Sequence, residues 1–241
     1  MSSPNGCLYI SYDGMLDQLG QSQVVPYLER LSSERPIHLL SFEKDEAWAD
    51  KIARDRMRKR LDRANIWWHP RRYHKRPSAL ATAWDILAGV VHGLWLMKAH
   101  RLRIVHARSY VAGVMAMTLK RVFGSRFLFD MRGFWADERI DGGIWPRGGR
   151  MYRVAKWFEK RLLLSSDHVV SVTRAAVVEM EAFSYLQGRM PLFTVIPPCA
   201  DLTRFRVPSS AQRPDFDLGY VGSAGTWYVF DAVARCFRSL L

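Results

Sequence analysis

Short apolar segments alternate with helix-like segments along most of this chain, and that alternation limits the fold more than any other feature. The apolar segments, rich in β-branched and aromatic residues, are 7–12, 37–42, 65–69, 103–109, 126–131, 167–173 and 193–197. Apolar strands that alternate with helices are typical of a parallel sheet covered on both faces. The sequence therefore predicts an α/β fold, with a doubly wound, Rossmann-like parallel sheet, over residues 1–207.

The segments with helical periodicity are 22–31, 46–63, 78–100, 111–122, 150–164 and 174–186. Ser22 is expected to cap the first helix, with Pro26 tolerated in its first turn. The helix of 150–164 carries one apolar face, made of Met151, Val154, Ala155, Phe158 and Leu162.

Residues 79–97, within the helix expected at 78–100, are apolar enough to raise the question of a membrane span. A span needs about 20 residues with few or no charges, and Asp85 and His92 interrupt this one. We expect a buried amphipathic helix instead. Its apolar positions at helical spacing are Leu80, Trp84, Leu87, Val91, Leu94 and Trp95.

The composition changes after residue 206. A polar stretch with two prolines and two serines indicates a linker at 208–215. The segment FDLGYVG at 216–222 resembles the first strand of a new α/β unit, and 223–241 would supply a turn and one helix. One strand and one helix do not bury a core of their own, so we expect 216–241 to be the truncated start of a second domain.

Cysteine content and charge exclude several classes of protein. The three cysteines lie far apart and form no Cys/His cluster, which argues against a disulfide framework or a zinc site and fits a reducing cytoplasm. The N-terminus lacks the pattern of a signal peptide.

The net charge of +13 attracts polyanions, but no nucleic-acid-binding motif accompanies it, so no nucleic acid is expected. An anionic membrane surface is a second interpretation of the basic segments, 54–63, 69–76 and 147–161.

The loop that follows the first apolar segment, 11–23, is the first candidate site. Gly14 and Gly20 lie in it, and a glycine-bearing loop that opens a helix offers backbone N–H groups to a phosphate or a sugar hydroxyl. The spacing is not GxGxxG, which disfavours a dinucleotide cofactor. A plain turn with glycines at positive φ is an equally good interpretation.

Polar residues at the ends of two apolar segments form the second candidate site. Ligands of open α/β sheets bind outside the carboxyl ends of strands, where His106, Arg108, Asp130 and Arg132 are expected. The arginines could hold a phosphate or carboxylate. Alternatively, Asp130 and one arginine form a structural ion pair, and a core role is the favoured interpretation for His106.

Several motifs together carry a resemblance that spans nearly the whole chain. VIPPCADLTRF at 195–205 resembles the segment that closes the N-terminal domain of glycosyltransferase family 4, and LGYVGSAGTWY at 218–228 resembles the start of that family's nucleotide-sugar domain. DHVVSVT, IVHARSY and FDMRG resemble its preceding strands.

This resemblance implies a GT-B fold and transfer of a sugar from a nucleotide donor to a glycan or glycolipid acceptor, usually with retention of configuration and without a metal or other cofactor. We expect a role in polysaccharide or glycolipid assembly in the cytoplasm, and the basic segments add a peripheral position at the inner membrane face. The alternative is a non-catalytic binding module with acceptor or membrane affinity. The site residues carried over are Arg132 as catalytic, Asp13, Gly14, Gln21, Arg108 and Asp130 on the acceptor side, and Gly20, Gly222 and Ser223 on the donor side.

Three departures from the family pattern bear on activity. The family often has histidine where this chain has Arg132. Its diphosphate-binding Arg and Lys are not visible in SAGTWYVFD, at 223–231. Its glutamate-bearing motif would lie beyond residue 241. We therefore expect the chain on its own to show no useful transfer.

Overall fold

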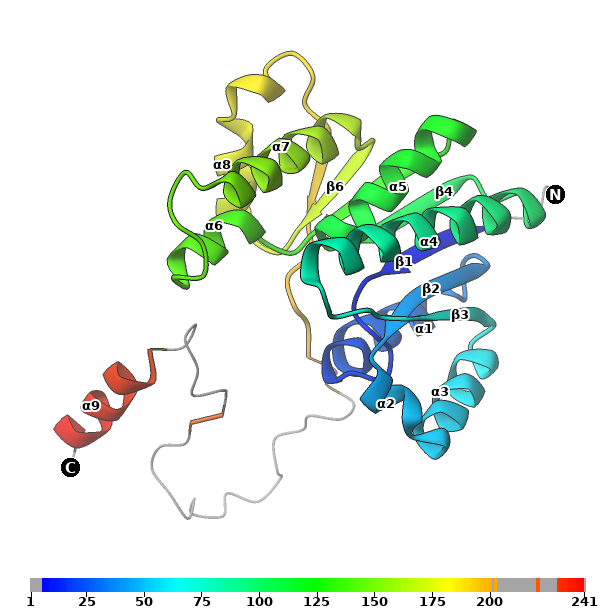
Figure 1. Cartoon of the computed structure of the whole chain (residues 1–241), viewed down its shortest axis with the longest axis horizontal. Helices are drawn as coiled ribbons and strands as arrows, with labels where there is room; N and C mark the ends of the chain where they lie inside the picture. Colours follow the sequence, from blue (N-terminus) through cyan, green and yellow to red (C-terminus); the bar gives the residue numbers. More distant parts are fainter. Residues whose placement is uncertain (1–5, 201, 203–219, 222–228, 241) are drawn as a thin grey trace.

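The computed structural model describes residues 6–200, 202, 220–221 and 229–240. Its strands form one seven-stranded parallel sheet in the order β3-β2-β1-β4-β5-β6-β7 (Figure 1). The strands are β1 (Cys7–Ser11), β2 (Ile37–Glu43), β3 (Ile66–Arg72), β4 (Ile104–Arg108), β5 (Arg126–Met131), β6 (His168–Ser171) and β7 (Leu192–Val195). The strand order reverses between β1 and β4, so the predicted doubly wound sheet is confirmed.

Helices connect the strands as the alternation predicted. They are α1 (Val25–Leu31), α2 (Asp45–Ala49), α3 (Lys51–Arg63), α4 (Ser78–Ala99), α5 (Ser109–Phe123), α6 (Trp135–Asp141), α7 (Arg150–Ser165), α8 (Arg174–Glu181) and α9 (Phe230–Leu240). A short π-helix, η1 (Gly20–Val24), runs into α1, and a 3₁₀ turn, η2 (Ser184–Leu186), follows α8. The helix expected over 46–63 is divided at Asp50, whose carboxylate caps α3, and α6 was not predicted.

The sheet carries a separate apolar core on each face, because successive side chains of a strand point to opposite sides. On one face Tyr9 and Leu39 pack with Leu28 of α1 and Leu61 of α3. On the other face the core lies under α4, α5, α7 and α8. Its strand and helix members include Leu8, Ile10, Leu40, Phe127, Phe129, Met115, Leu119, Leu162 and Val177.

The predicted start of the first helix was wrong. The Ser22 hydroxyl donates to the Gln18 carbonyl one turn earlier, at 2.7 Å, so Ser22 lies within the helix and does not cap it. The backbone N–H of Val25 donates to Gly20 O, which is the wider π-helical turn. Proline has no N–H to donate, and here the wider turn comes immediately before Pro26.

Two predicted apolar faces were also wrong in what they contact. Leu94 packs against the core as expected, but Leu80, Trp84, Leu87, Val91 and Trp95 of α4 are exposed. The buried side of α4 contains Ala81, Asp85, Leu96 and Met97. On α7, Ala155 and Leu162 are buried as expected, but Met151 and Val154 are about half exposed. Within the described part of the chain, Ala79–Ala99 is the single helical stretch long and apolar enough, by length and composition, to cross a membrane.

The linker expected at 208–215 lies outside the described residues, and so does most of the strand expected at 216–222. The proposed division into two domains therefore stays a prediction. The helix expected after residue 223 is present as α9.

Candidate ligand site at the carboxyl ends of the strands

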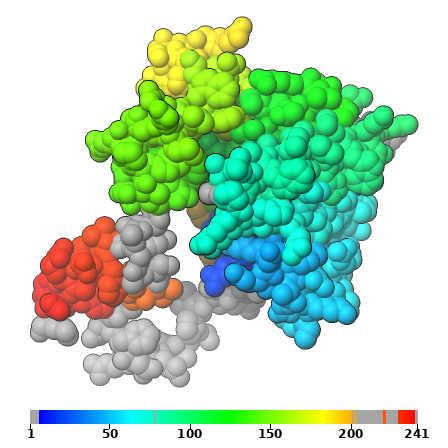
Figure 2. Space-filling model, in the orientation of Figure 1, coloured from blue at the N-terminus to red at the C-terminus, as the bar shows by residue number. Residues whose placement is uncertain are grey.

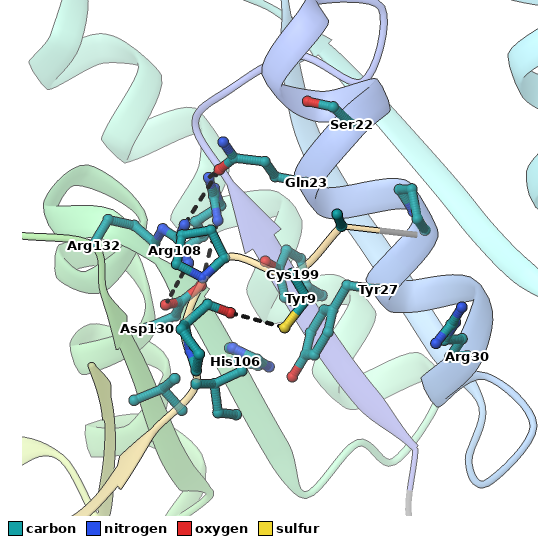
Figure 3. Close-up of a pocket in the computed structure, with 16 residues that line it drawn as sticks. Tyr9, Ser22, Gln23, Tyr27, Arg30, His106, Arg108, Asp130, Arg132 and Cys199 are labelled. Carbon is teal, nitrogen blue, oxygen red and sulfur yellow. Dashed lines mark hydrogen bonds and ion pairs between the residues drawn. The ribbon is translucent and has the colours of Figure 1, made fainter. Parts of the chain in front are cut away.

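A cavity of about 290 Å³ lies where β1, β4 and β5 end, beside η1 and α1 (Figure 3). Two of its walls are formed by side chains of these elements, and a third by the segment 196–200 that follows β7. The cavity lies at the reversal of strand order between β1 and β4. This is the position at which open α/β sheets bind ligands.

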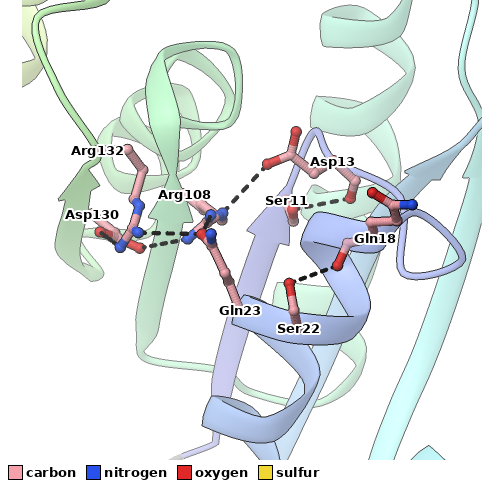
Figure 4. Close-up of polar contacts among 8 residues, drawn as sticks. All are labelled: Ser11, Asp13, Gln18, Ser22, Gln23, Arg108, Asp130 and Arg132. Atoms are coloured by element: carbon pink, nitrogen blue, oxygen red, sulfur yellow. Dashed lines mark hydrogen bonds and ion pairs between the residues drawn. The ribbon is translucent and has the colours of Figure 1, made fainter. Parts of the chain in front are cut away.

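Two arginines and a glutamine surround the Asp130 carboxylate in this cavity (Figure 4). Arg108 Nη1 lies 3.5 Å from Asp130 Oδ2, and Arg132 Nη1 lies 3.7 Å from Asp130 Oδ1. The Gln23 side-chain oxygen accepts hydrogen bonds from Arg108 Nη2 at 2.7 Å and from Arg132 Nη2 at 3.3 Å. Arg108 and Asp130 are partners in the parallel register of β4 and β5, which brings the predicted residues together.

The two arginines differ in their access to solvent. The Arg108 side chain is 6% exposed and also pairs with Asp13, Nε to Oδ2 at 3.3 Å. The Arg132 side chain is 28% exposed, while that of Asp130 is 9% exposed. Arg108 and Asp130 thus form a buried ion pair, as the structural interpretation expected. Arg132 is the more accessible of the two guanidiniums.

Burial raises the pKa of Asp130, and the guanidiniums of Arg132 and Arg108 oppose that effect. Burial, with a smaller contribution from Arg108, lowers the pKa of His106 to about 3. His106 is therefore a neutral imidazole near neutral pH, packed 4.6 Å from the Tyr9 ring between centroids. This agrees with the core role favoured for it.

The described residues that line the cavity include three arginines and one carboxylate. Arg30, Arg108 and Arg132 are the cations, and Asp130 is the one acidic residue among them. Asp13, at the rim, also pairs with Arg108, so the partly exposed guanidinium of Arg132 is the group that favours a ligand with a phosphate or carboxylate group.

The glycines of the 11–23 loop are explained by close packing and not by positive φ, because neither is among the described glycines with positive φ. A Cβ on Gly14 would lie 2.7 Å from Glu43 Oε2, and a Cβ on Gly20 would overlap the Gly14 carbonyl oxygen. Gln21 donates from its side chain to Leu16 O at 2.9 Å. Gln21 therefore stabilises this loop and does not line the cavity.

Two residues of the site were missed by sequence reasoning. Glu43, at the end of β2, is 1% exposed and accepts from the backbone N–H groups of Met15 and Leu16 at 2.9 and 3.1 Å. Its position at a strand end was the available signal. Gln23 could not be identified from the sequence, because it contacts Arg108 and Arg132 only through the helical turn of η1.

The remaining predicted residues are placed as follows. Asp13 reaches Arg108 from the rim of the cavity. Gly222 and Ser223 lie outside the described residues, so their donor-side role stays a prediction. Within the described ranges, no three His, Cys, Asp or Glu side chains are grouped so as to hold a metal ion.

The sheet order and the cavity at its switch point define a ligand-binding Rossmann-like domain of the GT-B type. Residues 34–199 match the family described as Glycosyl transferase 4-like domain. The match covers more than half of the chain, and the chain belongs to this family. No curated protein matches the sequence significantly.

Solved structures share the fold at low sequence identity. UGT2 of Phytolacca americana is 9% identical with a TM-score of 0.56, over 82% of this chain and 55% of that one. TcCGT1 is 13% identical with a TM-score of 0.56, over 87% and 54%. Sucrose-phosphate synthase of Thermosynechococcus elongatus is 12% identical with a TM-score of 0.54, over 83% and 50%. The chain thus spans about half the length of these structures.

Proposed function

We propose that this chain supplies the acceptor-side domain of a nucleotide-sugar-dependent glycosyltransferase. The observation that carries the proposal is the cavity at the switch point, where Arg132 is held beside a buried Arg108–Asp130 pair. Membership of the Glycosyl transferase 4-like family supports it. So do complexes of fold relatives, UGT2 with UDP-2-fluoro-glucose and pterostilbene, and TcCGT1 with UDP.

In this proposal the residues of the cavity act by position and charge. Asp130 and Gln23 fix the Arg132 guanidinium, so little reorganisation is needed when negative charge meets it. Arg108, more buried, fixes Asp130. Ser22 and Gln23 of η1 lie on the opposite wall, and the Gly14–Gly20 loop that leads into η1 is held by Glu43. The partly exposed guanidinium of Arg132 favours an anionic group on the bound acceptor or on the departing diphosphate.

The finer parts of the proposal follow from the family resemblance. Transfer proceeds with retention and without a metal, and the acceptor is a glycan or glycolipid of polysaccharide or glycolipid assembly. Donor contacts come mainly from the second domain, including Gly222 and Ser223. A binding module without catalysis is the second candidate, and it would use the same cavity.

Cys199 gives a direct test of ligand binding, because it lines the cavity and is exposed, while Cys7 is buried. In a Cys236→Ser variant, a thiol reagent should modify Cys199 first. We expect glycan fragments that carry phosphate or uronate to slow this modification, and matched neutral fragments to slow it less.

Arg132→Ala is the matched variant, and it should abolish the difference between anionic and neutral fragments. Equal rates with every fragment, or protection that persists unchanged in Arg132→Ala, would contradict the proposed site.

A further inference from the structure

A row of large apolar side chains runs along the outer side of α4. Successive members are separated by three or four residues, which places them on one face of a helix. Their exposed fractions are 72% for Leu80, 58% for Trp84, 56% for Leu87, 59% for Val91 and 58% for Trp95. We call these five residues the α4 stripe. At 1.5 Å per residue, the stripe is about 22 Å long.

The opposite side of α4 is fixed to the domain, so the helix cannot turn to bury the stripe. Asp85, 1% exposed, accepts from the Tyr12 hydroxyl at 2.8 Å and from the His74 backbone N–H at 3.0 Å. A Cβ on Gly89 would lie 2.5 Å from Met115 Sδ of α5. These contacts also oppose α4 leaving the domain to cross a membrane.

The stripe lies on an open face of the molecule. Figure 2 shows α4, in teal to green, at the surface in front of the sheet. The apolar surface continues onto the edge strand β3, because ring contacts lead from Trp95 through His100 and His38 to Trp67. Trp67 is 49% exposed. Exposed apolar surface of this extent marks an interaction site.

The part of the sequence that forms and flanks the stripe is rich in positive charge. Residues 64–129 contain eleven Lys or Arg and one acidic residue, the buried Asp85. The cations next to the two ends of α4 are Arg71, Lys75, Arg76, Lys98, Arg101 and Arg103, and Arg72, which pairs with Asp45. A second copy of this chain would bring the same cations face to face, whereas an anionic lipid surface would neutralise them.

We propose that the α4 stripe and its flanking cations dock this domain on an anionic lipid bilayer, with α4 lying in the plane of the interface. Tryptophan is favoured at the boundary between headgroups and acyl chains. An apolar helix face with basic neighbours binds anionic interfaces by apolar burial and charge together. The proposal concerns a surface separate from the cavity, and it does not depend on sugar transfer.

The test is partition of the full chain onto phosphatidylcholine vesicles with and without phosphatidylglycerol. We expect binding only when phosphatidylglycerol is present, weakened by high salt, with a blue shift of tryptophan fluorescence. Leu87→Gln should weaken binding several-fold, and Trp84→Gln with Leu87→Gln by about tenfold or more. Lys75→Glu with Arg76→Glu should reduce the preference for phosphatidylglycerol.

Ile52→Gln is the matched control, because Ile52 is 73% exposed on α3 at the opposite face of the sheet. It should bind vesicles as the unchanged chain does, and thermal melts of all variants should coincide.

Absence of binding to phosphatidylglycerol vesicles, or equal binding by Leu87→Gln and Ile52→Gln, would overturn the proposal. Concentration-dependent self-association that Leu87→Gln abolishes, without vesicle binding, would identify a dimer interface instead. Because no nucleotide sugar or glycan is present, these outcomes leave the cavity proposal untouched.

Discussion

The cavity and the α4 stripe are opposite exceptions to the rule that charged side chains are exposed and apolar side chains are buried. In the cavity, Arg108 and Asp130 are charged and buried. On α4, Trp84 and Leu87 are apolar and exposed. A buried pair costs desolvation that its attraction offsets only in part, and an exposed apolar row forgoes burial free energy. Both departures are what ligand-binding surfaces require, one for a polar ligand and one for an apolar surface.

The largest effect on stability is expected at the buried Arg108–Asp130 pair. Asp130→Ala leaves the buried Arg108 guanidinium with one carboxylate partner, the partly exposed Asp13, so we expect a loss of about 3 kcal/mol in the free energy of unfolding. Arg132→Ala removes a more accessible group and should cost about 1 kcal/mol or less. Urea denaturation of both variants measures the difference. Equal losses in the two variants would show that Arg132 is as important for stability as the buried Arg108–Asp130 pair.

A smaller effect is expected beneath the α4 stripe, where His38 and His69 lie with His38 Nδ1 3.1 Å from His69 Nε2. Burial, and the neighbouring imidazoles after it, lower the pKa of both histidines to about 4. Their contribution to stability is therefore complete above pH 6.5, the ordinary value, and is lost as pH falls through about 4.

His38→Gln with His69→Gln should flatten the dependence of stability on pH across that window, by an amount on the order of 1–2 kcal/mol. Thermal melts at a series of pH values measure it. His168→Gln, on β6, controls for the removal of a histidine from the sheet. An unchanged pH profile in the double variant would show that acid destabilisation arises elsewhere.

The sheet could be predicted from the sequence because strands buried on both faces are apolar throughout. Apolar strands that alternate with helices are buried in a parallel sheet with helices on both faces. The orientation of α4 could not. Periodicity identifies an apolar face but does not say what that face contacts. In α4 the buried side is set by Gly89, which permits close approach of α5, and by Asp85, which finds partners in Tyr12 and His74.

Prediction of the site had a similar limit. Arg108, Asp130 and Arg132 could be assigned because parallel strands end at the same edge of the sheet. Gln23 could not, because its position depends on a π-helical turn that propensity does not reveal. The glycines were recognised for the wrong reason, since close packing of Gly20 against Gly14 explains them without positive φ.

The central claim is that Arg132 is held for a ligand, and sugar transfer measures this most directly. The measurement uses a polypeptide that extends this chain by a complete nucleotide-sugar domain, with Arg132 unchanged, as Arg132→Lys and as Arg132→Ala. We predict loss of transfer by about a hundredfold or more in Arg132→Ala, as for removal of a fixed charge-stabilising group. Arg132→Lys should retain part of the activity, and the stability of all three should be similar. Unchanged transfer by Arg132→Ala would contradict the account.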